Sequence, residues 1–269
     1  MKQEMKIISL AVRLVCGIFA GLSLVYMSVF VLDIKLLLSL APKDYHNLIY
    51  QLLGVNHKPE WNRLTLPFLS SAPAINNTLL AGLFGLQHSS MLRGPLKKLL
   101  TFVLPESYHR SVYVFASASC LYIMYICWIP MTEVIWDIVN PWLRLVVFGL
   151  MLFSVCGVTT ALLNLNPIQM LGIAKRPEAA PTRLVLSGLY GFVRHPIYTF
   201  SLLLLWVTPR LTLGHLLLAT MFTLYVVYAV AVFEEPDLVK EFGSDYEKYM
   251  KTTPRFVPKI PWFKKQKRG

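Results

Sequence analysis

The chain has 269 residues, of which 55% are hydrophobic and only 15% charged, and its excess of Lys and Arg gives a net charge of +12. Because soluble domains carry roughly 25% charged residues, this composition excludes a disordered chain, a collagen-like chain and an ordinary cytosolic enzyme. It indicates a small membrane protein, in which a basic excess need not mean binding of nucleic acid, and no nucleic-acid partner is expected.

Six apolar runs predict an all-α fold, a polytopic membrane helical bundle of about six spans with a C-terminal helical hairpin. The runs are residues 14–32, 74–92, 111–131, 145–163, 197–209 and 211–233. A span needs about 20 mostly apolar residues. The run 74–92 is weaker because it contains two Asn, a Gln and a His.

The run 197–209 is too short to cross a membrane by itself, because a helix of that length covers about 20 Å of a ~30 Å hydrocarbon core. Either this segment dips in and out, or its helix starts earlier and carries Arg194, His195 and Pro196 to membrane depth. Polar backbone at that depth is tolerated only where protein covers it or where it lines a cavity. The stretch around Arg194 is therefore a candidate site.

Basic residues predict the orientation, because cytosolic loops carry an excess of Lys and Arg. They gather in the N-terminus, in the connections 93–110 and 164–196, and in the tail 234–269. With six spans these segments share one side, so both termini are predicted to be cytosolic. We expect one multi-pass domain over 1–269, made of an N-terminal span with a lumenal connection (1–73), a three-span middle (74–163) and a C-terminal half (164–269).

Three polar clusters fall on the predicted cytosolic side. They are Gln87, His88 and Ser89 with Arg93; the loop 188–198; and Glu234, Glu235 and Asp237. Each has a structural alternative: hydrogen bonds between membrane helices, an interfacial loop with a snorkelling Arg, and a solvated helix start. Together they suit a zwitterionic or cationic ligand. No metal site is expected, because the His and Glu are scattered and the four Cys lie in apolar runs.

The second and third clusters resemble a known family. The segments GLYGFVRHPIYTF (188–200) and FEEPDLVKEFGSDYEKYM (233–250) are similar to the paired C-terminal motif of the integral-membrane methyltransferases, which include isoprenylcysteine carboxyl methyltransferase. Upstream, FGLQHSSMLRGPLKK, YHRSVYVFASA and NLNPIQMLGIAK resemble the branch that contains nurim and methanethiol S-methyltransferase. Gln169 stands where that pattern has an acidic residue, so the role of that acid is in doubt here.

The resemblance implies S-adenosylmethionine as the cofactor, bound by the C-terminal half. The implied binding residues are Tyr190, Arg194, His195, Tyr198, Glu234 and Glu235. In this interpretation Arg194 takes the carboxylate of the cofactor, the Glu pair takes its ammonium group, and the Tyr198 ring faces the sulfonium. His88 and Arg93 are the candidate catalytic residues on the acceptor side, where they would favour the thiolate form of a thiol.

The sequence thus predicts a membrane-embedded S-adenosylmethionine-dependent methyltransferase acting on a small thiol or lipophilic acceptor, with the lipid bilayer as its partner. The alternative is a nurim-like, non-catalytic multi-pass protein of the inner nuclear membrane. Lys265 and Lys267 match a dilysine retrieval signal of the endoplasmic reticulum, or else belong to a solvated basic tail. The expected location is the endoplasmic reticulum or the inner nuclear membrane.

Overall fold

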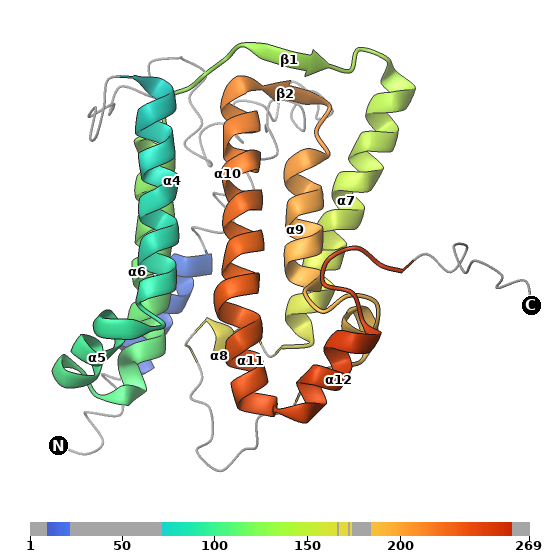
Figure 1. Cartoon of the computed structure of the whole chain (residues 1–269). Helices are drawn as coiled ribbons and strands as arrows, with labels where there is room; N and C mark the ends of the chain where they lie inside the picture. The colour runs from blue at the N-terminus through green and yellow to red at the C-terminus, as the bar shows by residue number, and fades with distance from the viewer. Residues whose placement is uncertain (1–9, 22–71, 166, 172, 174–183, 260–269) are drawn as a thin grey trace, which may run out of the picture. The chain divides into compact units, whose positions relative to one another are not determined.

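The computed structural model describes residues 10–21, 72–165, 167–171, 173 and 184–259 (Figure 1). These residues are mostly helical, and they divide into two compact units that are described one at a time. The predicted lumenal connection 33–73, apart from its last two residues, and the predicted signal at Lys265 and Lys267 lie outside the described residues.

The first unit is built on a helical pair, α4 (Pro73–Ser90) and α6 (Glu106–Ile126), joined by the shorter α5 (Gly94–Val103). Figure 1 shows α4 and α6 side by side, with α5 at one end of the pair. Pro73 and Pro95 each stand in the first turn of their helix, where the missing N–H leaves no hydrogen bond unmade.

Two asparagines tie α4 to the end of α6. Asn76 and Asn77 are fully buried. The Asn76 amide donates to the Cys127 carbonyl at 2.9 Å, and the Asn77 amide donates to the Ile129 carbonyl at 2.7 Å. The Asn77 side-chain oxygen also accepts from the Ile129 N–H at 2.9 Å. Polar side chains therefore fix the contact between these two apolar helices.

A small sheet departs from the all-α prediction. Strand β1 (Val134–Asp137) pairs antiparallel with β2 (Arg210–Thr212), with Val134 opposite Thr212 and Asp137 opposite Arg210. All four residues of β1 are exposed. A strand this short has no alternating apolar pattern to mark it, and it forms only because a distant segment of the chain supplies its partner.

The second unit contains α7 (Pro141–Leu163), α9 (Pro196–Trp206), α11 (Glu235–Phe242) and α12 (Ser244–Thr252), with the 3-10 turn η2 (Gly188–Gly191) before α9. The Asn140 side chain caps α7 by accepting from the N–H groups of Trp142 and Leu143. Gly243, with φ +57°, separates α11 from α12 in a conformation that favours glycine.

Small residues bring α7 and α9 close together. Ser154, Gly157 and Ala161 are buried on one face of α7. A side chain on Gly157 would overlap the ring of Phe200 in α9, and Phe200 also meets Phe153 edge-to-face with ring centroids 5.4 Å apart. Small residues of this kind let membrane helices approach and gain van der Waals contact.

Helix α10 (Leu213–Ala229) continues through the π-helical turn η3 (Val230–Glu234) into α11, and the short α8 (Pro167–Met170) follows α7. Among the described residues, two helices are long and apolar enough to cross a membrane, Pro141–Leu163 and Leu213–Phe242. They coincide with the predicted spans 145–163 and 211–233. The count of six spans, the side of each terminus and the three-part division of one domain stay predictions.

Candidate functional site

The loop before α9 is held by the segment that follows α12. The backbone N–H of Arg194 donates to the Pro254 carbonyl at 2.9 Å, and that of His195 donates to the Arg255 carbonyl at 3.2 Å. The Thr199 hydroxyl donates to the Phe256 carbonyl at 2.8 Å. Residues 194–199 and 254–256, which are far apart in the sequence, are thus hydrogen-bonded to each other. These bonds hold Arg194 and His195 in place before α9.

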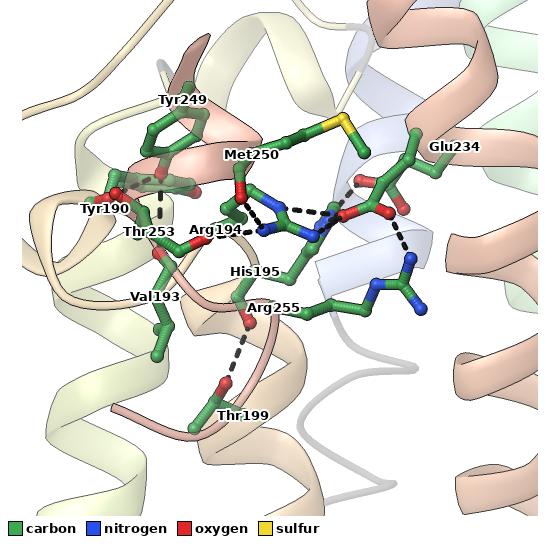
Figure 2. Close-up of polar contacts among 11 residues, drawn as sticks. Tyr190, Val193, Arg194, His195, Thr199, Glu234, Tyr249, Met250, Thr253 and Arg255 are labelled. Atoms are coloured by element: carbon green, nitrogen blue, oxygen red, sulfur yellow. Dashed lines mark hydrogen bonds and ion pairs between the residues drawn. The ribbon is translucent and has the colours of Figure 1, made fainter. Parts of the chain in front are cut away.

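Arg194 links the loop before α9 to Glu235 and to the end of α12 (Figure 2). Its Nε and Nη2 donate to Glu235 Oε1 at 2.8 and 2.6 Å, while Nη1 donates to the carbonyls of Met250 and Thr253 at 3.1 and 2.5 Å. Each guanidinium nitrogen therefore already donates to a protein acceptor. The sequence-based expectation directed these donors to a ligand carboxylate, whereas the structure shows them linking α11, α12 and the α9 loop.

Glu235 is the most enclosed carboxylate of the site, with its side chain 3% exposed. It accepts from Arg194, lies 3.3 Å from His195 Nε2, and forms an ion pair with Arg255 through its other oxygen. Buried carboxylates are stable only when they are paired and hydrogen-bonded. Three cationic or protonatable partners meet this requirement for Glu235.

Glu234 faces a different environment. Its side chain is 35% exposed, and its Oε1 lies 3.4 Å from His195 Nδ1. Glu234 ends the π-helical turn η3 and Glu235 begins α11, and the Glu235 N–H donates to the Val230 carbonyl. Pro236 explains this turn, because a proline ring clashes with the carbonyl four residues earlier in a regular helix and widening the turn relieves the clash.

His195 is 5% exposed and lies between the two carboxylates. Burial by itself lowers the pKa of His195, but hydrogen bonds to Glu234 and Glu235 and their negative charges raise it by more, so its pKa lies above the usual value. The raised pKa shifts the imidazole toward its protonated form, whose positive charge is attracted to both carboxylates.

This raised pKa predicts a loss of stability on the alkaline side. A group whose pKa is raised on folding contributes stability that is fully present below its unfolded pKa of about 6.5 and is lost as pH rises through its folded pKa. We expect the midpoint of thermal unfolding in detergent to fall across this interval. His195→Asn is the control: it should flatten the dependence, and a slope that survives in this variant would contradict the assignment.

The two predicted aromatic residues have distinct surroundings. Tyr198 packs its ring against His195 with centroids 5.9 Å apart. Tyr190 is buried, and its hydroxyl donates to the Ala161 carbonyl at 3.4 Å. Its own carbonyl accepts from the Tyr249 hydroxyl at 2.5 Å. Tyr190 thus connects η2 to α7 and α12, while Tyr198 lies directly beside the charged cluster.

Among the buried side-chain atoms of the described residues, the Tyr246 hydroxyl and Arg255 Nε have no hydrogen-bond partner. Tyr246 is 1% exposed. Burial raises the pKa of Tyr246, and the negative charges of Glu235 and Glu234 raise it further, while the positive charge of Arg194 lowers it. A buried hydroxyl without a partner is costly, and a bound ligand or an ordered water is the usual reason for it.

The predicted acceptor-side residues lie in the first unit. His88 stands in the last turn of α4, with its Nε2 2.8 Å from the Tyr113 hydroxyl and its Nδ1 3.3 Å from the Ser117 hydroxyl, both in α6. Arg93 is half-buried at the start of α5. The nearby Gln87 has a buried side-chain oxygen without a hydrogen-bond partner. His88 is thus part of a polar contact between two helices.

Sequence reasoning missed Arg255. This residue lies six positions after Tyr249, in a segment for which no site residue was predicted. Its ion pair with Glu235 places it in the cluster. The available signal was a basic residue shortly after the FGxxYxxY segment, in a region where acids had already been singled out. No group of three or more His, Cys, Asp or Glu side chains suited to a metal ion occurs in the described ranges.

Comparison with known proteins shows the family to which this chain belongs. Residues 78–255 match the NnrU protein family, and the chain belongs to that family. It is 33% identical over 190 residues to methanethiol S-methyltransferase 1 of Bradyrhizobium diazoefficiens, with 68% of this chain and 66% of the relative covered. It is also 33% identical over 188 residues to the methanethiol S-methyltransferase of Mycobacterium tuberculosis, covering 68% of this chain and 77% of the relative.

A more distant relative is nurim of Danio rerio, 29% identical over 167 residues, with 57% of this chain and 60% of the relative covered. No solved structure matches the chain. The family resemblance expected from the RHP and EEP segments is thereby confirmed. The match includes the whole of the cluster around Arg194 and Glu235, and also His88 and Arg93.

Proposed function

We propose that this protein is a membrane-embedded methyltransferase that uses S-adenosylmethionine and acts on a small thiol or lipophilic acceptor. The observation that carries the proposal is the cluster of buried Arg194, His195 and Glu235 with the partly exposed Glu234, together with the buried Tyr246 hydroxyl that has no partner. The names of the relatives support the reaction class, and the two apolar helices support the membrane setting.

The residues present fit this cofactor. S-adenosylmethionine supplies an activated methyl group on a sulfonium, and it also carries an ammonium, a carboxylate and ribose hydroxyls. The partly exposed Glu234 is an acceptor suited to the ammonium group. The Tyr246 hydroxyl and Arg255 Nε are unused donors suited to the carboxylate or to the ribose. The Tyr198 ring beside His195 is suited to a cation.

This assignment gives the cluster two roles, one pair of residues that holds the local structure and one pair that contacts the ligand. Arg194 and Glu235 hold the α9 loop, α11 and the segment after α12 in one arrangement, because their polar atoms are satisfied within the protein. Glu234 and Arg255 remain partly exposed and are assigned to the ligand. His195 holds a proton between the two carboxylates and thereby fixes the direction of the Glu234 side chain.

On the acceptor side we assign His88 as the base and Arg93 as the group that favours the anionic acceptor. A thiol reacts as its thiolate, so its proton must pass to a neighbouring base. Contacts of the Tyr113 and Ser117 hydroxyls with the ring nitrogens support His88 in this role, because they hold the orientation of the ring.

Calorimetry with S-adenosylmethionine tests the proposal by comparing the original chain with a variant that lacks the Tyr246 hydroxyl. Tyr246→Phe removes a hydroxyl that has no partner in the protein, so the variant should unfold at the same temperature as the original chain. Its affinity for S-adenosylmethionine should fall roughly tenfold, which corresponds to one lost hydrogen bond.

Tyr249→Phe is the matched control. The Tyr249 hydroxyl donates to the Tyr190 carbonyl, so its removal should lower the free energy of unfolding by about 1 kcal/mol and change the affinity less. No heat from the intact protein would contradict the cofactor. Heat that is unchanged by Tyr246→Phe would contradict the place of Tyr246 in the site.

The non-catalytic, nurim-like alternative is less favoured, because the charged residues of the cluster are all present and paired. We propose the endoplasmic reticulum or the inner nuclear membrane as the location, supported by the similarity to nurim. Imaging of a copy tagged at the N-terminus distinguishes the two, since that tag leaves Lys265 and Lys267 free.

A further inference from the structure

Helix α5 exposes an apolar face of its own. Leu99, Phe102 and Val103 are 56%, 90% and 63% exposed. Their spacing of three and four residues places them on one side of the helix. An aromatic side chain that is 90% exposed gains almost no burial energy from its own protein. This face is therefore suited to contact with an apolar environment that the described residues do not supply.

The opposite face of α5 is basic. Lys97 and Thr101 are exposed on this side, Lys98 is exposed at its border one turn before Phe102, and the helix contains no Asp or Glu. The charges therefore find no acidic partner within α5. An apolar stripe with lysines on the other side is the pattern of helices that lie in the plane of a membrane surface.

The place of α5 in the first unit agrees with this pattern. It connects the ends of α4 and α6 and lies at an angle to them (Figure 1). The outer side of α4 is also apolar and exposed, with Leu79, Leu83 and Leu86 at 45%, 46% and 67%. Both α4 and α5 thus expose apolar side chains that are suited to lipid. At about 15 Å, α5 itself is too short to cross a membrane.

We propose that α5 is an interfacial helix that binds the surface of a bilayer rich in anionic lipid. In this arrangement Leu99, Phe102 and Val103 enter the acyl boundary, and Lys97 and Lys98 meet the phosphate groups of anionic lipids. Anionic headgroups attract basic residues next to the membrane, so the lysines would strengthen the binding of α5 to the bilayer surface. This inference is independent of the proposed enzymatic activity.

Site-directed spin labelling of the full chain tests the proposal. In a background with Cys16, Cys120, Cys127 and Cys156 replaced by alanine, a nitroxide is attached at Phe102→Cys or, as the matched control on the opposite side of the same helix, at Lys97→Cys. The chain is reconstituted in bilayers of phosphatidylcholine with phosphatidylglycerol. Collision rates with oxygen, which dissolves in lipid, and with a water-soluble nickel chelate are then measured.

We expect the label at position 102 to favour oxygen several-fold over the nickel chelate, and the label at position 97 to show the reverse. In a Lys97→Gln, Lys98→Gln variant labelled at 102, the oxygen preference should decrease in the mixed bilayer and stay unchanged in pure phosphatidylcholine. Equal nickel access at 102 and 97 would overturn the proposal. So would protection of position 102 from both reagents, which indicates a protein partner or a second copy, or an oxygen preference that does not respond to the lysine substitutions.

Discussion

Glu235→Gln is expected to lower the free energy of unfolding by about 3–5 kcal/mol, because it removes one partner of a buried ion-pair cluster. The remaining amide cannot balance Arg194, His195 and Arg255, which all converge on this carboxylate. The side chains of Glu235 and Arg194 are 3% and 8% exposed, so water cannot replace the lost charge. Denaturation in mild detergent, followed by circular dichroism, measures the effect.

The adjacent Glu234→Gln is the matched control for this experiment. Its side chain is 35% exposed and contacts His195 at 3.4 Å, so the loss of stability should stay below about 1 kcal/mol. The affinity for S-adenosylmethionine should instead fall tenfold or more, as expected for the loss of a charge-assisted hydrogen bond of about 1.5–3 kcal/mol. Equal effects of the two substitutions on stability would contradict the division between a structural and a ligand-facing carboxylate.

Gly157→Ala is expected to lower the free energy of unfolding by about 1–3 kcal/mol, the usual cost of forcing extra volume into a close contact. A methyl group at this position would overlap the ring of Phe200, and the helices α7 and α9 would have to separate. Because α9 begins at Pro196, directly after Arg194 and His195, a shift of α9 also disturbs the charged cluster, and we expect weaker S-adenosylmethionine binding in the same variant.

Gly149→Ala is a control within the same helix. A methyl group on Gly149 meets no atom within 4 Å, so this substitution only exchanges one helical residue for a better helix former. Stability should stay the same or rise by up to ~1 kcal/mol. Thermal unfolding of both variants, side by side, separates the effect of the α7–α9 contact from that of helix propensity. A Gly157→Ala protein as stable as Gly149→Ala would show that α7 and α9 are not in close contact.

Apolar runs are a local signal, and the predicted runs 145–163 and 197–209 overlap the helices α7 and α9. The start of α7 was predicted four residues too late, because the cap that Asn140 provides before Pro141 was not used. The sheet between β1 and β2 was missed for a different reason. Its stability depends on a pairing between distant segments, and nothing in the four residues of β1 marks them as a strand.

The sequence by itself determined the membrane setting, the family and the residue types of the site, because composition and short motifs are written in consecutive residues. It could not decide which residue of each kind faces a ligand. Only the tertiary structure shows Arg194 occupied by Glu235 and by two carbonyls, adds Arg255, and leaves the Tyr246 hydroxyl without a partner. These differences arise from burial and from contacts between segments far apart in the chain, which no local pattern encodes.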